Sequence, residues 1–339
     1  MPYPEKSIHS FWPHARPWLA LALAAALAPA PAPLLAQDVP QSVSLPTGIN
    51  TGGTSFLDGF SRTTPGWAVI EYLRYYDLDA VKNAYGADVA ALRDPRIRTT
   101  ALLTQVTYVS SYQPFGGVLG FNAIVPLVNL NASFAADSPA RLSDSGFGLG
   151  DLTVGPYIQL PPVLRDGRPV FVQRFEIDAI APIGKFDSDR NLNPSSGYWS
   201  LVPQWAFTVL PTPDWEISAR VSYIYNFRAD KAPNVTDTDD FTFHNGQAGD
   251  AAWVNFASSV ALTPAFRLGV NGYYLKQLRD DRTNGQRVAG TKQTQFYAGP
   301  GASWKFDEHN IVNVNLYLPI EVKNAAAGKS LNVQYVHVF

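Results

Sequence analysis

Apolar and polar side chains alternate along residues 215–227, WEISARVSYIYNF. Every second position is apolar or aromatic, namely Trp215, Ile217, Ala219, Val221, Tyr223, Tyr225 and Phe227. The positions between them are mostly polar, namely Glu216, Ser218, Arg220, Ser222 and Asn226, with one Ile224. A period of two places the two sets on opposite faces of a β-strand, whereas a helix would scatter both sets around its axis. The stretch is therefore predicted to be a strand with one apolar and one mostly polar face.

This predicted strand is about 13 residues long, whereas strands of soluble proteins usually have about 5–6 residues. At roughly 3.3 Å per residue and a tilt near 45°, it would span about 30 Å, the thickness of the hydrocarbon core of a bilayer. Its apolar face begins with Trp215 and ends with Tyr223, Tyr225 and Phe227, which matches the two aromatic girdles of a transmembrane barrel. A long strand of a soluble sandwich would alternate in the same way, so this stretch alone leaves both architectures open.

The rest of the chain decides between them, because the same alternation gives twelve strand candidates after Gly66. They are 67–75, 97–109, 118–129, 151–160, 170–181, 199–209, 215–227, 253–262, 266–277, 293–306, 311–320 and 331–339. Connections of roughly 10–25 residues alternate with turns of roughly 3–9 residues, as in barrels with long extracellular loops and short periplasmic turns. We therefore predict an all-β fold, a transmembrane antiparallel up-and-down β-barrel of about 12 strands with both ends on the periplasmic side.

The beginning of the chain has the pattern of a secretory signal. Lys6 and Arg16 precede an apolar run over residues 18–28, which a Pro-Ala repeat interrupts. A basic start, a short apolar core and a small residue before the cut describe a signal peptide, and a cut after Ala36 fits. The apolar core is too short to span a bilayer as a helix, although an uncleaved anchor is the alternative. Residues 1–36 are therefore predicted to be a signal peptide.

Two further parts follow the predicted signal peptide. Residues 37–66 are rich in Gly, Pro, Ser and Thr without any period, and are predicted to form a flexible N-terminal segment, either periplasmic or inside the lumen. Residues 67–339 are predicted to form the barrel, in the outer membrane of a Gram-negative bacterium. The last strand ends on Phe339, which resembles the terminal signal that the barrel-assembly machinery recognises. This machinery and outer-membrane lipid are therefore predicted partners.

The composition narrows the function. The chain of 339 residues carries 26 Lys and Arg against 28 Asp and Glu, and this balance gives no indication of nucleic-acid binding. It has no Cys, which excludes disulfides and Cys-ligated metals. Aromatic residues make up 13% and charged residues only 16%, against about 25% charged residues in a typical soluble domain. A wall with one face toward lipid accounts for this combination.

Charged side chains in two predicted strands share the polar face: Arg174, Glu176 and Asp178 in one, Glu216 and Arg220 in the other. A basic residue on the lipid side would cost roughly 2–4 kcal/mol at mid-depth, so these side chains are predicted to face the lumen. Tyr297 and Tyr317, with Asn313, Asn315 and Gln295, are predicted to add an aromatic and polar lining. We expect Arg174 and Arg220 to set the selectivity of the lumen. The alternative is a salt-bridge network that only braces a narrow barrel.

An enzyme within the barrel finds little support in the sequence. The three His residues after the predicted signal peptide, His244, His309 and His337, fall in loops or near the periplasmic end. No G-x-S-x-G motif is present, and a nucleophile needs a base within hydrogen-bonding reach. Residues 187–193 place oxygen side chains at alternate positions but lack the Gly and Glu of a calcium loop. We therefore predict no enzyme activity, no cofactor and no metal site.

Two Gly- and Pro-rich stretches carry a resemblance to a known family. They are GLGDLTVGP at 148–156 and APIGKFD at 181–187, followed by Asn193, Tyr198, Trp199 and Pro203. They resemble outer-membrane proteins linked to phenol meta-pathway degradation, and the resemblance covers about residues 45–339. It implies passive passage of a small hydrophobic or aromatic molecule through an outer-membrane channel. A structural or surface-display barrel without transport is the second hypothesis, and an outer-membrane lipid hydrolase is the third.

Overall fold

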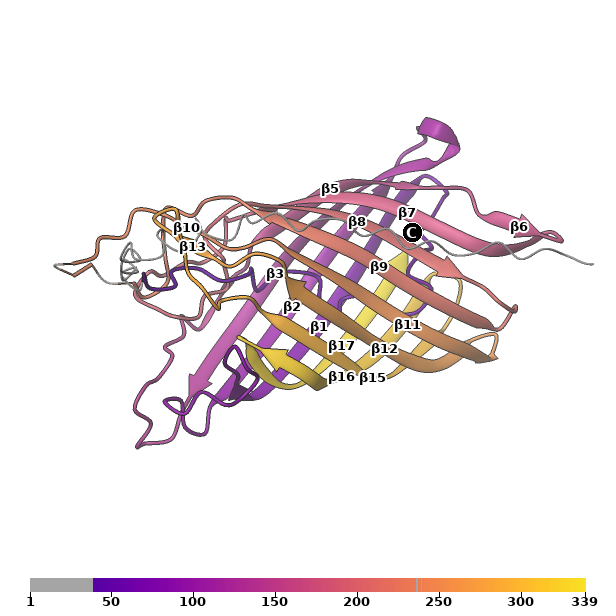
Figure 1. The fold of residues 1–339 in the computed structure, drawn as a ribbon. Coiled ribbons are helices and arrows are strands. Elements are labelled where there is room, and N and C mark those ends of the chain that lie inside the picture. Colours follow the sequence, from indigo (N-terminus) through magenta and orange to yellow (C-terminus); the bar gives the residue numbers. More distant parts are fainter. Residues whose placement is uncertain (1–38, 236, 239) are drawn as a thin grey trace, which may run out of the picture. The chain divides into compact units, whose positions relative to one another are not determined.

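The computed structural model describes residues 39–235, 237–238 and 240–339 (Figure 1). The predicted signal peptide, 1–36, lies outside the described residues. No helix in the described part of the chain is long and apolar enough to cross a membrane. The strands are β1 (Gly66–Val81), β2 (Arg96–Val109), β3 (Val118–Ser133), β4 (Phe147–Leu149), β5 (Leu152–Gln159), β6 (Val163–Arg165), β7 (Arg168–Ala181), β8 (Ser200–Val209), β9 (Trp215–Asn226), β10 (Gly246–Gln247), β11 (Ala251–Thr263), β12 (Phe266–Gln277), β13 (Arg282–Thr283), β14 (Gln286–Arg287), β15 (Thr294–Lys305), β16 (Asn310–Lys323) and β17 (Ala326–Val338).

Twelve of these strands close into an antiparallel barrel. Around the ring they follow the order β1, β2, β3, β5, β7, β8, β9, β11, β12, β15, β16 and β17. The last strand pairs with the first, from Ala68 opposite Val338 to Val81 opposite Ala326. This closure removes both free edges of the sheet, as a bilayer requires. The predicted twelve-stranded barrel is confirmed.

The two ends of the barrel differ as the connection lengths predict (Figure 1). At one end the turns are tight: Thr263 Oγ1 accepts a hydrogen bond from Phe266 N at 3.0 Å, and Asp307 Oδ1 accepts one from Asn310 N at 2.8 Å. Such side-chain caps stabilise short turns. At the other end lie the long loops, which include the small sheet β10-β13-β14. We call these the short-turn end and the long-loop end.

One connection was predicted wrongly. We expected about ten residues between the last two strands. In the structure β16 ends at Lys323 and β17 begins at Ala326, so that only two residues separate them. The stretch Asn324-Ala-Ala-Ala-Gly328 has no alternation of polar and apolar residues and therefore resembles a loop. Pairing with β1 nevertheless holds its second half in the sheet, with Gly328 opposite Leu78.

The alternation predicted for 215–227 separates the two faces of β9. Glu216 is fully buried and Arg220 is 9% exposed, and both face the lumen. Trp215 and Tyr225 are 40% and 39% exposed on the outer surface. Outward apolar side chains recur on the other strands of the ring, for example Leu102 and Val270. The outside of the barrel is therefore apolar and its inside polar, the distribution that a lipid-embedded barrel needs.

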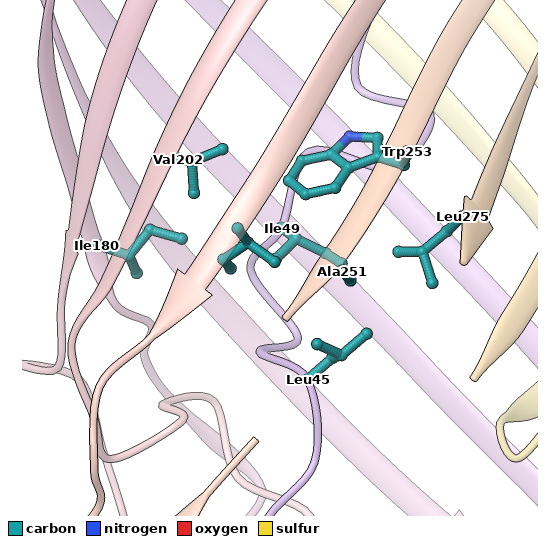
Figure 2. Packing of buried hydrophobic residues seen from close by; sticks show 8 residues of the cluster. Leu45, Ile49, Ile180, Val202, Ala251, Trp253 and Leu275 are labelled. Atoms are coloured by element: carbon teal, nitrogen blue, oxygen red, sulfur yellow. The ribbon is translucent and has the colours of Figure 1, made fainter. Parts of the chain in front are cut away.

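Residues 39–65, which we call the lumen segment, run through the inside of this barrel. Near its start, Thr283 Oγ1 at the long-loop end donates a hydrogen bond to Pro40 O at 2.8 Å. Farther along, Leu45 and Ile49 pack among inward-facing apolar side chains of five strands (Figure 2). At the short-turn end, Arg62 Nη1 donates a hydrogen bond to the carbonyl of Phe339. Arg62 lies shortly before β1, which begins at Gly66. Of the two positions left open for 37–66, the described residues of this segment occupy the lumen.

Candidate functional site

The charged residues predicted to face the lumen meet around a residue of the lumen segment. Arg220 donates two hydrogen bonds to Asp58, from Nε at 2.9 Å and from Nη2 at 2.7 Å. Arg174 Nη2 lies 3.9 Å from the same carboxylate. Glu176 Oε2 lies 3.6 Å from Arg174 Nε and 3.7 Å from Arg220 Nη1. Asp178, on the same face of β7, accepts a hydrogen bond from Gln204 Nε2 at 2.5 Å and, among the described residues, forms no ion pair.

Sequence reasoning missed Asp58 because it lies in a stretch without periodicity. A signal was nevertheless present, since Asp58 is the only charged residue between positions 39 and 61. Two planar guanidinium groups, each able to donate two parallel hydrogen bonds, face one carboxylate. This carboxylate belongs to the lumen segment and not to a strand of the barrel wall. The arrangement can bind a carboxylate, and in this structure Asp58 supplies it.

Glu216 forms a separate contact nearer the short-turn end. Its carboxylate accepts hydrogen bonds from Ser259 Oγ at 2.7 Å and from Ser218 Oγ. It also accepts one from the backbone N–H of Leu57 at 3.3 Å. Of the predicted acidic residues, Glu216 therefore does not join the arginine group but holds the lumen segment one residue before Asp58.

The predicted Tyr297 and Tyr317 form an aromatic cluster with Tyr273. The rings of Tyr273 and Tyr297 are stacked, with centroids 5.0 Å apart, and Tyr317 is 5.8 Å from Tyr273. Gly52 of the lumen segment lies against this cluster with a φ of +66°, and a Cβ there would come within 3.0 Å of the Tyr317 ring. Only glycine combines that backbone conformation with so close an approach. The aromatic cluster therefore fits the backbone of the lumen segment.

The wall of the barrel is interrupted beside this cluster. The ladder between β16 and β17 ends at Tyr317 opposite Ser330, so that residues 318–323 and 326–329 have no ladder partners across this seam. Pro319 lacks a backbone donor, and Gly328 lies so close to β1 that a Cβ would come within 2.2 Å of Asp77 O. These features draw β17 toward β1 and away from β16. We call this interruption the wall gap.

A cavity of about 420 Å³ lies at the wall gap, near the long-loop end. Its lining combines apolar residues and glycine with charged ones, namely Pro319, Ile320, Val322, Ala327 and Gly328 with Asp79, Lys82, Glu321 and Lys323. Ile320 is 59% exposed on the outside, whereas Val322 and Ala327 are buried and pack with Tyr273, Tyr297 and Tyr317. Apolar side chains of β16 and β17 therefore lie both on the outer surface beside this cavity, at Ile320, and against the aromatic cluster, at Val322 and Ala327.

Loop residues around Asp281 fix the other end of the lumen segment. Asp281 is fully buried, and its Oδ2 accepts a hydrogen bond from Gln41 Nε2 at 2.7 Å. Its Oδ1 accepts from Gln277 Nε2 at 2.6 Å and from Gly249 N at 2.8 Å. Burial raises the pKa of Asp281 to about 6 from 3.8. The carboxyl group therefore titrates near neutral pH at the point where the lumen segment is anchored.

This pKa predicts a pH dependence of stability. The folded protein binds the Asp281 proton more tightly than the unfolded chain, so the resulting stabilisation is complete below about pH 4 and is lost as the pH rises through about 6. We expect Asp281→Asn to remove this dependence, which for such a shift amounts to about 3 kcal/mol. Denaturant unfolding in micelles at a pH below about 4 and at a pH well above about 6 measures this pH dependence. Asp137→Asn, on an exposed loop, is the control. Equal pH dependence in Asp281→Asn and wild type would contradict it.

Other candidates from the sequence have structural roles. Asn193 donates from Nδ2 to Asp187 O at 2.9 Å and to Arg190 O at 3.1 Å, so it closes its own loop. In the GLGDLTVGP stretch, a Cβ at Gly155 would come within 2.2 Å of Ile177 O. Close approach of neighbouring strands explains that glycine. Within residues 39–235, 237–238 and 240–339, no three His, Cys, Asp or Glu side chains form a group that could hold a metal ion.

The closed ring, its apolar exterior and its polar lumen define a β-barrel of the outer-membrane channel type. The family model described as "Putative MetA-pathway of phenol degradation" matches residues 78–335, and the chain belongs to this family. The fold is similar to that of the COG4313 outer membrane channel from Pseudomonas putida F1, with a TM-score of 0.70 and 16% sequence identity over 84% of this chain and 100% of that chain.

More distant structures and curated sequences add little. The translocator domain of the autotransporter NalP from Neisseria meningitidis matches with a TM-score of 0.46 and 10% identity, over 83% of this chain and 91% of that chain. This similarity is too low to support an argument about function. No curated protein sequence matches the chain.

Proposed function

We propose that this protein is an outer-membrane channel for passive passage of a small hydrophobic or aromatic compound, and that the compound crosses the barrel wall through the wall gap. The interrupted ladder between β16 and β17 carries this proposal. A closed barrel leaves no unpaired backbone facing lipid unless protein or a cavity covers it. Here a cavity of about 420 Å³ lies where β16 and β17 separate, and small-molecule sites are concave and combine apolar side chains with a few polar groups.

The occupied lumen supports the same route. The lumen segment receives hydrogen bonds from wall residues on several sides, including Asn255 Nδ2 to Asn50 O at 2.7 Å and Asn332 Nδ2 to Gly52 O at 3.2 Å. A polar interior filled in this way offers an apolar compound poor solvation. The aromatic cluster offers stacking surfaces beside the wall gap instead.

The family supports an aromatic substrate, since its description refers to phenol degradation. The solved relative from Pseudomonas putida F1 is described as an outer membrane channel, which agrees with passage rather than display. A surface-display barrel without transport, the alternative function, would have no use for a cavity at an interrupted seam of its wall.

Intact cells test the proposal, because lipopolysaccharide excludes apolar dyes that phospholipid dissolves. We expect cells that produce the protein to take up N-phenyl-1-naphthylamine at least about tenfold faster than cells without it, equivalent to a barrier lower by about 1.4 kcal/mol. Fluorescence of the dye in phospholipid measures the rate. Cells that produce Tyr297→Ala, with one ring of the cluster removed, should fall between the two. Equal dye uptake with and without the protein would favour the display alternative.

A further inference from the structure

Asp58 is a carboxylate that the barrel wall does not supply. It belongs to the lumen segment, and Arg220 holds it through two hydrogen bonds of 2.9 and 2.7 Å. The Arg220 side chain is only 10% exposed and that of Asp58 12%. A buried, forked guanidinium–carboxylate pair is the geometry with which proteins recognise carboxylate ligands. Asp58 thus occupies the position of a ligand.

Aromatic residues lie close to Asp58 in the sequence and to Arg174 in the barrel wall. The sequence around Asp58 is Phe56-Leu-Asp-Gly-Phe60, so a phenyl ring lies two residues before and two residues after Asp58. On the wall side, the guanidinium of Arg174 lies 5.6 Å from the centroid of the Tyr157 ring. The two arginines therefore offer a small aromatic acid a guanidinium fork for its carboxylate and, at Tyr157, an aromatic side chain beside it.

Within the described part of the chain, Arg174 has a donor without a hydrogen-bond partner, and the backbone next to Asp58 is strained. Arg174 Nε is buried without a hydrogen-bond partner, although Arg174 Nη1 donates to Phe60 O at 3.2 Å. Leu57, directly before Asp58, has a φ of +60°, which is unfavourable for a residue other than glycine. Withdrawal of Asp58 would relieve this strain and leave the fork of Arg220 with only Glu176, 3.7 Å away. A second carboxylate would restore the hydrogen bonds and the charge balance.

We propose that Arg220, with Arg174 beside it, is a binding site for the carboxylate of a small aromatic acid, and that Asp58 occupies this site until such an acid displaces it. The inference rests on the proposed function, for which it names the substrate class. Displacement exchanges one carboxylate for another and frees the middle of the lumen segment from the wall. Substrate binding and release of Asp58 from Arg220 are then the same event.

A single cysteine reports the displacement. The chain has no Cys, and Ser55 is 5% exposed, with its Oγ 3.4 Å from Asn315 Oδ1. In Ser55→Cys protein in micelles, we expect benzoate to raise the rate of maleimide labelling at least about tenfold. Benzyl alcohol, which has the ring without the charge, and acetate, which has the charge without the ring, should change it less than about twofold. Heat-modifiable mobility on gels confirms that each variant is folded.

Two further substitutions in the Ser55→Cys background assign the effect to the site. Asp58→Asn should label fast without benzoate, because the occupant has lost its charge, whereas the control Asp137→Asn should label like the parent. Arg220→Lys keeps the charge but loses the fork, and should need at least about tenfold more benzoate for half-maximal labelling. Slow labelling of folded Asp58→Asn, or equal responses to benzoate, benzyl alcohol and acetate, would overturn the inference. Dye uptake by cells is independent of this assay, so that failure of the proposed function and failure of this site are distinguishable.

Discussion

Deletion of residues 39–61 is expected to raise the single-channel conductance of the barrel at least about tenfold, because the lumen segment then no longer obstructs the ion path. The wall that it leaves is polar: Asn315 donates to Thr54 O at 3.2 Å, and Gly52 N donates to Asn255 Oδ1 at 2.8 Å. Once the segment is removed, water replaces these partners and hydrates the lumen. Planar-bilayer recordings measure the conductance of the deletion variant and of the wild type.

A reducible disulfide between the lumen segment and the barrel wall provides the matched control for the deletion. Ser55→Cys/Asn315→Cys keeps the lumen segment and joins it to β16, since the two native side chains already approach to 3.4 Å. When oxidised, this variant should conduct no more than the wild type. A deletion variant that is folded but conducts like the wild type would show that the segment does not fill the lumen.

Arg220→Met is expected to lower the free energy of unfolding by about 3–5 kcal/mol, since it leaves buried carboxylates without their main counter-charge. Asp58 would lose both of its short hydrogen bonds, and Glu176 would keep Arg174 as its only counter-charge. Denaturant unfolding with phospholipid vesicles, followed by tryptophan fluorescence, measures the loss.

The control for this substitution is Arg93→Met, which breaks an exposed ion pair with Asp137 at 2.6 Å. Because water screens exposed pairs, it should cost less than about 1 kcal/mol. A similar loss in both variants would mean that the lumen group contributes no more than a surface pair. The two arginines would then have little influence on the lumen segment.

The strands of the barrel wall could be predicted from the sequence because the alternation of polar and apolar residues depends only on positions close together in the chain. Alternation along 215–227 suffices to place Glu216 and Arg220 inside and Trp215 and Tyr225 outside, since successive strand residues point to opposite faces. The C-terminal hairpin was mispredicted because Asn324-Ala-Ala-Ala-Gly328 has no such alternation. Pairing with β1 keeps it in the sheet, and that contact joins residues far apart in the chain.

The lumen segment and its contacts could not be predicted. Asn255 meets Asn50, 205 positions earlier, and Arg220 meets Asp58, 162 positions earlier. No periodicity in a Gly- and Ser-rich stretch encodes such pairs. The wall gap was equally hidden, because Pro319 in a strand indicates a missing donor but does not show where the neighbouring strand lies.

A disulfide across the wall gap tests the central claim most directly. Leu318 and Lys329 are the next positions beyond the last paired residues, Tyr317 and Ser330, and Leu318→Cys/Lys329→Cys would join the two strands there. Leu316→Cys/Leu331→Cys places the same bond inside the intact ladder as a control. We predict that oxidation of the first pair lowers cellular uptake of N-phenyl-1-naphthylamine to the level of cells without the protein, that reduction restores it, and that the control pair has no effect. Unchanged dye uptake with the first pair fully oxidised would contradict passage through the wall gap.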